Sequence, residues 1–164
     1  MPGPNIFDPQ FEEGERPPGF QARRARIGYQ LGSELVGLSL FELPPGEAGG
    51  PYHYHYGDDE VLIVLEGRPT LRTAEGTRAL EPGEAVHFPL GEAGAHQLRN
   101  DTAERVRYLA VSSNGRPDVI VYPDSNKIGL GERLPHGGGL RAFFPADAAV
   151  DYWHGERPPR DGDA

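Results

Sequence analysis

Glycine and proline occur so often in this chain that long regular elements are excluded from most of it. Its 164 residues include 23 Gly and 17 Pro. Between residues 35 and 122, no long stretch repeats its apolar positions with the helical period of about 3.6. The frequent Gly and Pro residues predict short strands joined by tight turns, as in a β-sandwich or barrel, and they argue against a helical bundle. The predicted strands are 35–43, 51–56, 60–66, 70–73, 77–80, 85–88, 96–99, 105–111 and 119–122.

The chain is long enough for one domain and shows no internal repeat. Residues 1–20 are rich in Pro and Gly and poor in apolar residues, so we expect a flexible N-terminal arm. Residues 21–121 then form the barrel. We expect residues 122–164 to be an extension that packs on the barrel through Trp153, with about the last ten residues frayed.

Composition excludes several kinds of site and partner. The chain has no cysteine, so disulfides, thiolate metal sites and cysteine nucleophiles are excluded, and a transition metal must use imidazole and oxygen ligands. A net charge of −9 argues against nucleic acid as a partner. The longest aliphatic run, 61–65, is far too short to span a membrane, and residues 1–5 do not resemble a signal peptide. We therefore expect a cytoplasmic protein.

Four residues form a candidate metal site. His53 and His55 are alternate residues of one predicted strand, so their imidazoles share a face. The turn Gly57-Asp58-Asp59 brings Glu60 back to that face at the start of the next strand, and His96 would come from a distant strand. Three imidazoles and one carboxylate would leave positions open for water or substrate on an octahedral ion.

The spacing of these residues resembles that of the cupins, a superfamily of double-stranded β-helix (jelly-roll) barrels. From its first histidine onward, the first cupin motif is matched by His53-x-His55-x4-Glu60-x6-Gly67. The second motif is matched by Gly83-x5-Pro89-x-Gly91 and by His96-x3-Asn100, with two extra residues between the two parts. Segments 122–127 and 151–156 also resemble the tail of a poorly characterised group of single-domain cupins.

The resemblance implies an all-β barrel in which His53, His55, Glu60 and His96 bind one divalent transition metal: Fe, Mn, Ni, Co, Zn or Cu. It favours a mononuclear metalloenzyme that acts on a small polar organic molecule, a dioxygenase first and an isomerase or lyase next. The alternative is a non-catalytic binding or sensing barrel with a structural or ligand-holding metal. Small cupin barrels often pair through an exposed sheet, so we also expect a homodimer, with the arginine-rich strand at 22–29 as a candidate edge.

The remaining polar and aromatic residues have simpler explanations. His87 is expected outside the ligand set, and the tyrosines that alternate with the ligand histidines should face away from them. A solvated turn is the favoured environment for Asp58 and Asp59, and a charged strand edge is favoured for the arginine cluster. The residues in question are Tyr52, Tyr54, Tyr56, Arg23, Arg24 and Arg26; His136 and His154 lie outside the barrel motifs.

Overall fold

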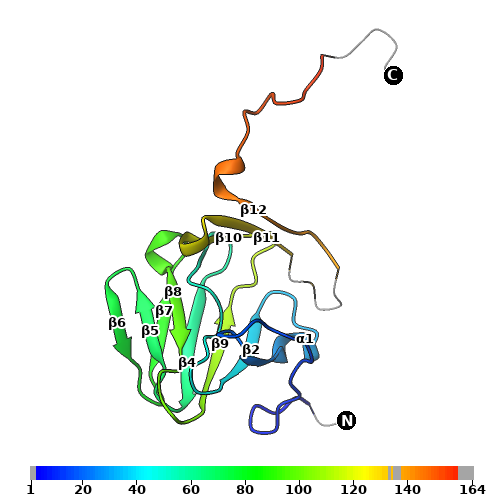
Figure 1. The fold of residues 1–164 in the computed structure, drawn as a ribbon. Coiled ribbons are helices and arrows are strands. Elements are labelled where there is room, and N and C mark those ends of the chain that lie inside the picture. Colours follow the sequence, from blue (N-terminus) through cyan, green and yellow to red (C-terminus); the bar gives the residue numbers. More distant parts are fainter. Residues whose placement is uncertain (1–2, 133, 135–137, 159–164) are drawn as a thin grey trace.

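Short antiparallel strands make up most of the computed structural model, which describes residues 3–132, 134 and 138–158 (Figure 1). The first elements are β1 (Arg23–Ala25), the single helical turn α1 (Ile27–Gln30), β2 (Gly37–Leu43), β3 (Tyr54–His55), β4 (Glu60–Glu66), β5 (Thr70–Thr73), β6 (Gly76–Ala79) and β7 (Ala85–Phe88). They are followed by β8 (His96–Arg99), β9 (Val106–Ser112), β10 (Asp118–Tyr122), β11 (Lys127–Gly131) and β12 (Arg141–Pro145). Three 3₁₀ turns lie at Glu92–Gly94, Pro123–Ser125 and Ala146–Ala148. Helices long and apolar enough to cross a membrane are absent from the described residues.

The strands form three antiparallel sheets in which segments distant in sequence lie side by side. The largest sheet has the order β1-β2-β9-β4-β7, the second β12-β11-β10-β3 and the third β6-β5-β8. Strand β9 pairs with both β2 and β4, which joins the start of the barrel sequence to its end. The all-β prediction is confirmed, and β4, β5, β7 and β8 lie where the turn pattern places them.

The main core lies between the five-stranded and the three-stranded sheets. Strand β4 contributes Leu62 and Val64, each 1% exposed, which alternate along the strand and point to the same face. Leu71 of β5 and Leu98 of β8 meet them from the opposite sheet. This cluster lies beside the candidate metal ligands, because Phe88 belongs to the core and stacks on the ring of His96.

A second apolar cluster lies behind the five-stranded sheet and includes part of the N-terminal arm. Ile6 and Phe11 pack against Leu40 and its buried neighbours, and the Glu12 amide donates to the carbonyl of Arg24 on β1. The Glu12 carboxylate also pairs with Arg24 and Arg26, so these two arginines make ion pairs within the chain. As expected, β1 is an edge strand, although it is shorter than the predicted segment 22–29.

Glu42 is a buried carboxylate of this sheet that pairs with three arginines, of which Arg105 is the most distant at 3.7 Å. It lies 2.9 Å from Arg23 on β1 and 2.7 Å from Arg107 on β9, the strands on either side of its own strand. The arginines neutralise a side chain that is only 7% exposed.

The C-terminal extension differs from the expectation in two ways. Strands β11 and β12, which the sequence pattern did not predict, continue the four-stranded sheet outward from β10. Beyond the last 3₁₀ turn, the chain leaves the body as an extended segment (Figure 1). Tyr152 and Trp153 are 84% and 71% exposed, so the expected packing of Trp153 on the barrel is wrong. Their side chains contact each other edge to face.

Candidate metal centre

His53, His55, His96 and Glu60 come together at one end of the core, and all three sheets contribute. His55 belongs to β3, His96 begins β8 and Glu60 begins β4. His53 and His96 are joined by an isolated antiparallel bridge with N···O distances of 3.1 and 2.9 Å. The ring centre of His53 lies 4.8 Å from that of His55 and 4.8 Å from that of His96.

Each of the three imidazoles is held through its Nδ1 atom. His53 Nδ1 lies 2.8 Å from the carbonyl oxygen of Pro51, and His96 Nδ1 lies 2.9 Å from that of Gly94. A carbonyl oxygen only accepts hydrogen bonds, so Nδ1 carries the proton in both rings. In a neutral imidazole, Nε2 is then the unprotonated nitrogen, the form in which histidine binds a metal.

His55 has a charged acceptor. Its Nδ1 lies 2.6 Å from Oδ2 of Asp118, which is completely buried, and Asp118 Oδ1 accepts a hydrogen bond of 3.0 Å from the Gly57 amide. A carboxylate on the far nitrogen of a histidine fixes the orientation of the ring and makes the other nitrogen a stronger ligand.

The Nε2 atoms of His55 and His96 both lie close to the Glu60 carboxylate. His55 Nε2 is 3.8 Å from Glu60 Oε2, and His96 Nε2 is 3.9 Å from Glu60 Oε1. Two ligand atoms that each lie about 2.1 Å from a common transition metal are at most about 4.2 Å apart. These two distances would allow His55 and His96 each to share an ion with Glu60, and imidazole and carboxylate donors suit a divalent transition metal.

Burial keeps two of these histidines neutral. Desolvation is the main cause that lowers the pKa of His53 to about 3, and the neighbouring His96 and His55 lower it further, while Glu60 opposes the change. Desolvation also lowers the pKa of His96 to about 4. Both rings are therefore neutral at neutral pH, as metal binding requires.

The two extra residues before His96 have a structural role. Glu92–Gly94 forms a 3₁₀ turn, and its last carbonyl is the acceptor for His96 Nδ1. A Cβ atom on Gly94 would lie 1.9 Å from the carbonyl oxygen of Pro89, so only glycine fits there. Asn100 closes the next turn, donating to the carbonyl oxygens of Leu43 and Glu104 at 3.0 and 2.7 Å.

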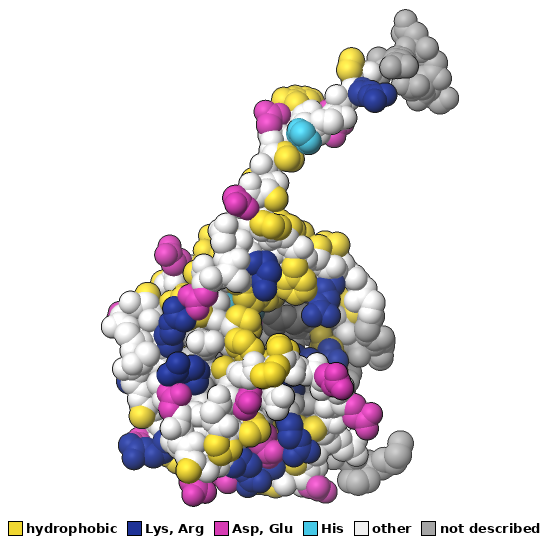
Figure 2. Space-filling view, in the orientation of Figure 1, with side chains coloured by type: hydrophobic (Ala, Val, Ile, Leu, Met, Phe, Trp, Pro, Cys, Tyr) yellow, Lys and Arg dark blue, Asp and Glu magenta, His cyan; other side chains and the backbone are white. Residues whose placement is uncertain are grey.

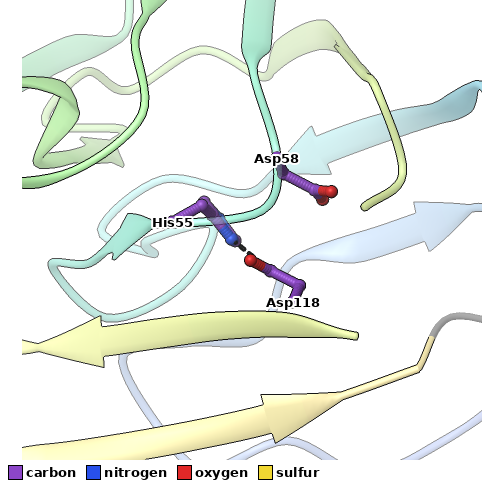
Figure 3. A group of neighbouring side chains, drawn as sticks. All are labelled: His55, Asp58 and Asp118. Atoms are coloured by element: carbon purple, nitrogen blue, oxygen red, sulfur yellow. Dashed lines mark hydrogen bonds and ion pairs between the residues drawn. The ribbon is translucent and has the colours of Figure 1, made fainter. Parts of the chain in front are cut away.

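A group of buried acids behind His55 was missed by the sequence pattern (Figure 3). Asp58 is 1% exposed, so the expectation that it lies in a solvated turn is wrong. One of its oxygens accepts a hydrogen bond from the Gly115 amide. Ligand atoms of His55, Asp58 and Asp118 all lie within 4.8 Å of one another, which makes this group a potential metal site.

The contacts of these acids favour a supporting role for them. Both carboxylates accept backbone N–H groups, and Asp118 faces the protonated side of His55, away from Glu60. Asp118 directly precedes the apolar strand 119–122. A single acid at the start of an apolar strand was the one sequence feature that could have indicated a buried role for Asp118.

The remaining predicted residues lie away from the four candidate ligands. His87 is exposed on β7, with Nε2 2.6 Å from Oδ1 of Asp59. Tyr54 and Tyr56 pack edge to face on the opposite side of β3, and Tyr52 is buried beneath the guanidinium of Arg72. His154 is exposed in the extended C-terminal segment, and His136 lies outside the described residues.

The fold and the site together define a barrel of the double-stranded β-helix type with a histidine-rich centre. The family profile described as "Cupin domain" matches residues 39–112, which include all four candidate ligands. Residues 39–112 therefore form a cupin domain, and the chain shares its fold with a solved member of the cupin superfamily. Among curated proteins, no sequence matches it significantly.

Solved structures agree with this assignment. A sugar phosphate isomerase of the cupin superfamily from Silicibacter pomeroyi is 25% identical, with a TM-score of 0.76 over 90% of this chain and 95% of that one. A candidate sugar phosphate isomerase from Acidithiobacillus ferrooxidans is 26% identical, with a TM-score of 0.71 over 88% of this chain and 84% of that one. A polyketide cyclase from Streptomyces resistomycificus shares the fold at 24% identity, with a TM-score of 0.59 over 72% and 83% of the two chains.

Proposed function

We propose that this cupin is a metal-dependent enzyme in which His53, His55, Glu60 and His96 hold one divalent transition metal. The observation that carries the proposal is that all three imidazoles are held through Nδ1, so that Nε2 is in each case the nitrogen that would bind a metal. Each presents Nδ1 to a fixed acceptor, and two of the Nε2 atoms lie 3.8 and 3.9 Å from the Glu60 carboxylate. Fe, Mn, Ni, Co, Zn and Cu all accept such ligands.

A metal bound by these residues would polarise oxygen atoms of a substrate as a Lewis acid. The chain itself contributes a dry, rigid surrounding, because His55 and His96 are 5% and 4% exposed and Phe88 covers one face of the His96 ring. The supporting acceptors hold the rings in place, so little rearrangement is needed when a ligand binds.

Isomerisation of a small hydroxy-carbonyl compound, such as a phosphorylated sugar, is the reaction class that we favour. Two structural relatives with nearly full mutual coverage are named as sugar phosphate isomerases, and this supports isomerisation over the dioxygenase chemistry that sequence reasoning ranks first. Such substrates carry neighbouring oxygens that suit two open positions on one metal.

The test combines metal analysis with turnover. The purified full chain should carry about one equivalent of a transition metal, and His96→Ala and Glu60→Ala should lose it while Asp59→Asn retains it. Each metal-loaded form is then incubated with aldose and ketose phosphates in D₂O, and deuterium incorporation is followed by NMR, with oxygen uptake recorded in parallel.

The outcomes separate the alternatives. Solvent deuterium in the product supports an isomerase, whereas oxygen uptake would indicate a dioxygenase instead. Stoichiometric metal with ligand-induced stabilisation and no turnover would favour the non-catalytic binding barrel. Protein that binds no metal after reconstitution would refute the assignment of the four ligands.

We also propose that the chain acts in the cytoplasm as a homodimer. The edge position of β1 supports pairing, although the N-terminal arm already uses one carbonyl of that strand through the Glu12 amide. Light scattering tests the assembly, and a monomeric mass would contradict it.

A further inference from the structure

One face of the four-stranded sheet continues from the candidate metal centre to a basic and aromatic surface. Ile120 pairs with His55 and Val121 pairs with Tyr54, which places the Tyr122 side chain on the face of His53. Tyr122 pairs in turn with Lys127, and Gly129 pairs with Phe143. Because alternate residues share a face, Tyr122, Lys127 and Phe143 lie on the same side of the sheet as His53.

The side chains on this face form a connected stack. The ring of Tyr122 lies 5.9 Å from that of His53 and nearly parallel to it, at 19°. Lys127 Nζ lies 4.5 Å from the centre of the Tyr122 ring and 5.7 Å from that of Phe143. Because Tyr122 lies between them, the centre of the His53 ring and Lys127 Nζ are at most about 10 Å apart.

The absence of a side chain at Gly129 allows the Tyr122 and Phe143 rings to lie close to the backbone of β11. A Cβ atom at this position would lie 2.8 Å from Cε1 of Phe143 and 3.3 Å from Cε2 of Tyr122. The missing side chain therefore lets both rings lie across the strand and against the lysine.

The charges on this face are not neutralised within the described part of the chain. Lys127 is the only lysine of a protein with net charge −9. In residues 3–132, 134 and 138–158, no carboxylate lies within 4.0 Å of Lys127 Nζ or of the Arg141 guanidinium, which is 5.4 Å from the Phe143 ring. Asp124 belongs to the turn just before Lys127, but its oxygens bind Arg72 at 2.6 and 2.9 Å.

A hollow of about 180 Å³ adjoins this lysine. It is lined by Ser125, Lys127, Phe143, Phe144 and Pro145, at the ends of β11 and β12. Figure 2 shows basic side chains beside hydrophobic ones on the body of the protein below the extended C-terminal segment. An ammonium and a hydroxyl can both donate hydrogen bonds to an anion there, while the aromatic walls reduce competition from water.

We propose that Lys127, with the Ser125 hydroxyl, forms a subsite for the phosphate group of the substrate. The inference rests on the proposed function, in that the other end of the substrate would reach the metal centre past Tyr122. Arg141, on the far side of Phe143, adds positive charge at the margin. In this proposal, the segment 122–127 has a role that the sequence alone did not indicate. Its turn places Ser125 and Lys127 beside the anion.

Inorganic phosphate tests the subsite without any metal. Calorimetric titration of the metal-free full chain at low salt should give saturable binding, and Lys127→Met should weaken it by about tenfold or more. Lys127→Arg should retain most of the affinity. Arg68→Met is the matched control, because it removes the same charge from a side chain that is 61% exposed and pairs with Glu81.

Three results would overturn the proposal: no saturable phosphate binding, equal affinity in the wild type and Lys127→Met, or equal weakening by Lys127→Met and Arg68→Met. Circular dichroism spectra and urea unfolding curves show that each variant is folded.

A second titration separates this subsite from the proposed function. A five-carbon sugar and its terminal phosphate ester are compared on metal-loaded protein. The ester should bind more tightly, and the difference should vanish in Lys127→Met; a difference that persists would also overturn the subsite. Metal content, measured on the same samples, reports independently on the four ligands, so phosphate binding by protein that takes up no metal would refute the metal centre alone.

Discussion

Replacing Asp118 with asparagine tests whether this buried carboxylate supports the metal centre through His55. The side chain keeps its size but loses its charge and one acceptor. Asp118 now accepts from two donors, His55 Nδ1 at 2.6 Å and the Gly57 amide at 3.0 Å. An amide offers one oxygen and one NH₂ group. In Asp118→Asn, either the His55 Nδ1–H or the Gly57 N–H would therefore face the NH₂ group, which is itself a donor.

The expected loss follows from these contacts. Removing the partner of a metal-binding histidine usually lowers metal affinity about 10- to 100-fold, equivalent to about 1.4–2.8 kcal/mol. A buried donor left without an acceptor also costs about 1–3 kcal/mol of folding stability. Because Asp118 is fully buried, water cannot replace the lost acceptor. We therefore expect Asp118→Asn to fold, with lower stability and clearly weaker metal binding.

The assay is a competition between the metal-free protein and a chelator of known affinity, with Zn²⁺ or Co²⁺ as the metal. Asp59→Asn is the control, because it makes the same chemical change at an exposed carboxylate whose partner is His87. Equal affinity in Asp118→Asn and wild type would refute the supporting role. If Asp118→Asn and Asp58→Asn abolish binding while Glu60→Gln does not, the metal lies instead among the buried acids.

Three further predictions concern the fold. Leu62→Ala should lower the free energy of unfolding by about 2–5 kcal/mol, because Leu62 is 1% exposed in the main core; a urea titration that shows less than 1 kcal/mol would contradict this packing. Burial alone would raise the pKa of Glu42, but its arginine partners lower this pKa overall in the folded protein. The ionised carboxylate therefore stabilises the fold fully above its unfolded pKa of about 4.3. This stabilisation is lost as the pH falls through the lower pKa of the folded state. Urea unfolding between pH 6 and 3 should show a stability advantage over Glu42→Gln that shrinks on acidification, and a constant difference would be inconsistent with the ion pairs. Gly129→Ala should cost about 1–3 kcal/mol by forcing aside two aromatic rings, and unchanged unfolding would show that the rings move freely.

Sequence patterns predicted the barrel strands well, because turn residues mark where each strand ends and alternation marks its two faces. Strand β4 begins and ends at the predicted residues, and the turn before it carries Glu60 to the histidines. Alternate residues of a strand share a face, so the proximity of His53 and His55 was predictable from their spacing alone. His96 was placed by its motif despite the two extra residues before it.

The parts that sequence reasoning missed depend on contacts between distant segments. Asp58 follows a glycine in a polar turn, where exposure is the ordinary expectation, yet the backbone of Gly115 comes close enough to cover it. Strand β12 pairs with β11 across a long connection, and no local alternation shows that pairing. Trp153 is large and apolar, so burial was the natural prediction, but packing depends on where the preceding strand directs the chain.

The contribution of all three sheets to the centre has a consequence for how the barrel unfolds. In the metal-free chain, each sheet can open with its own local free energy. A metal bound by one residue of β3, one of β4 and one of β8 would be released by the opening of any of these sheets. Its binding free energy would therefore oppose every partial opening alike. A loaded barrel should exchange its slowest amide protons in a single cooperative event, and metal release would report the same event.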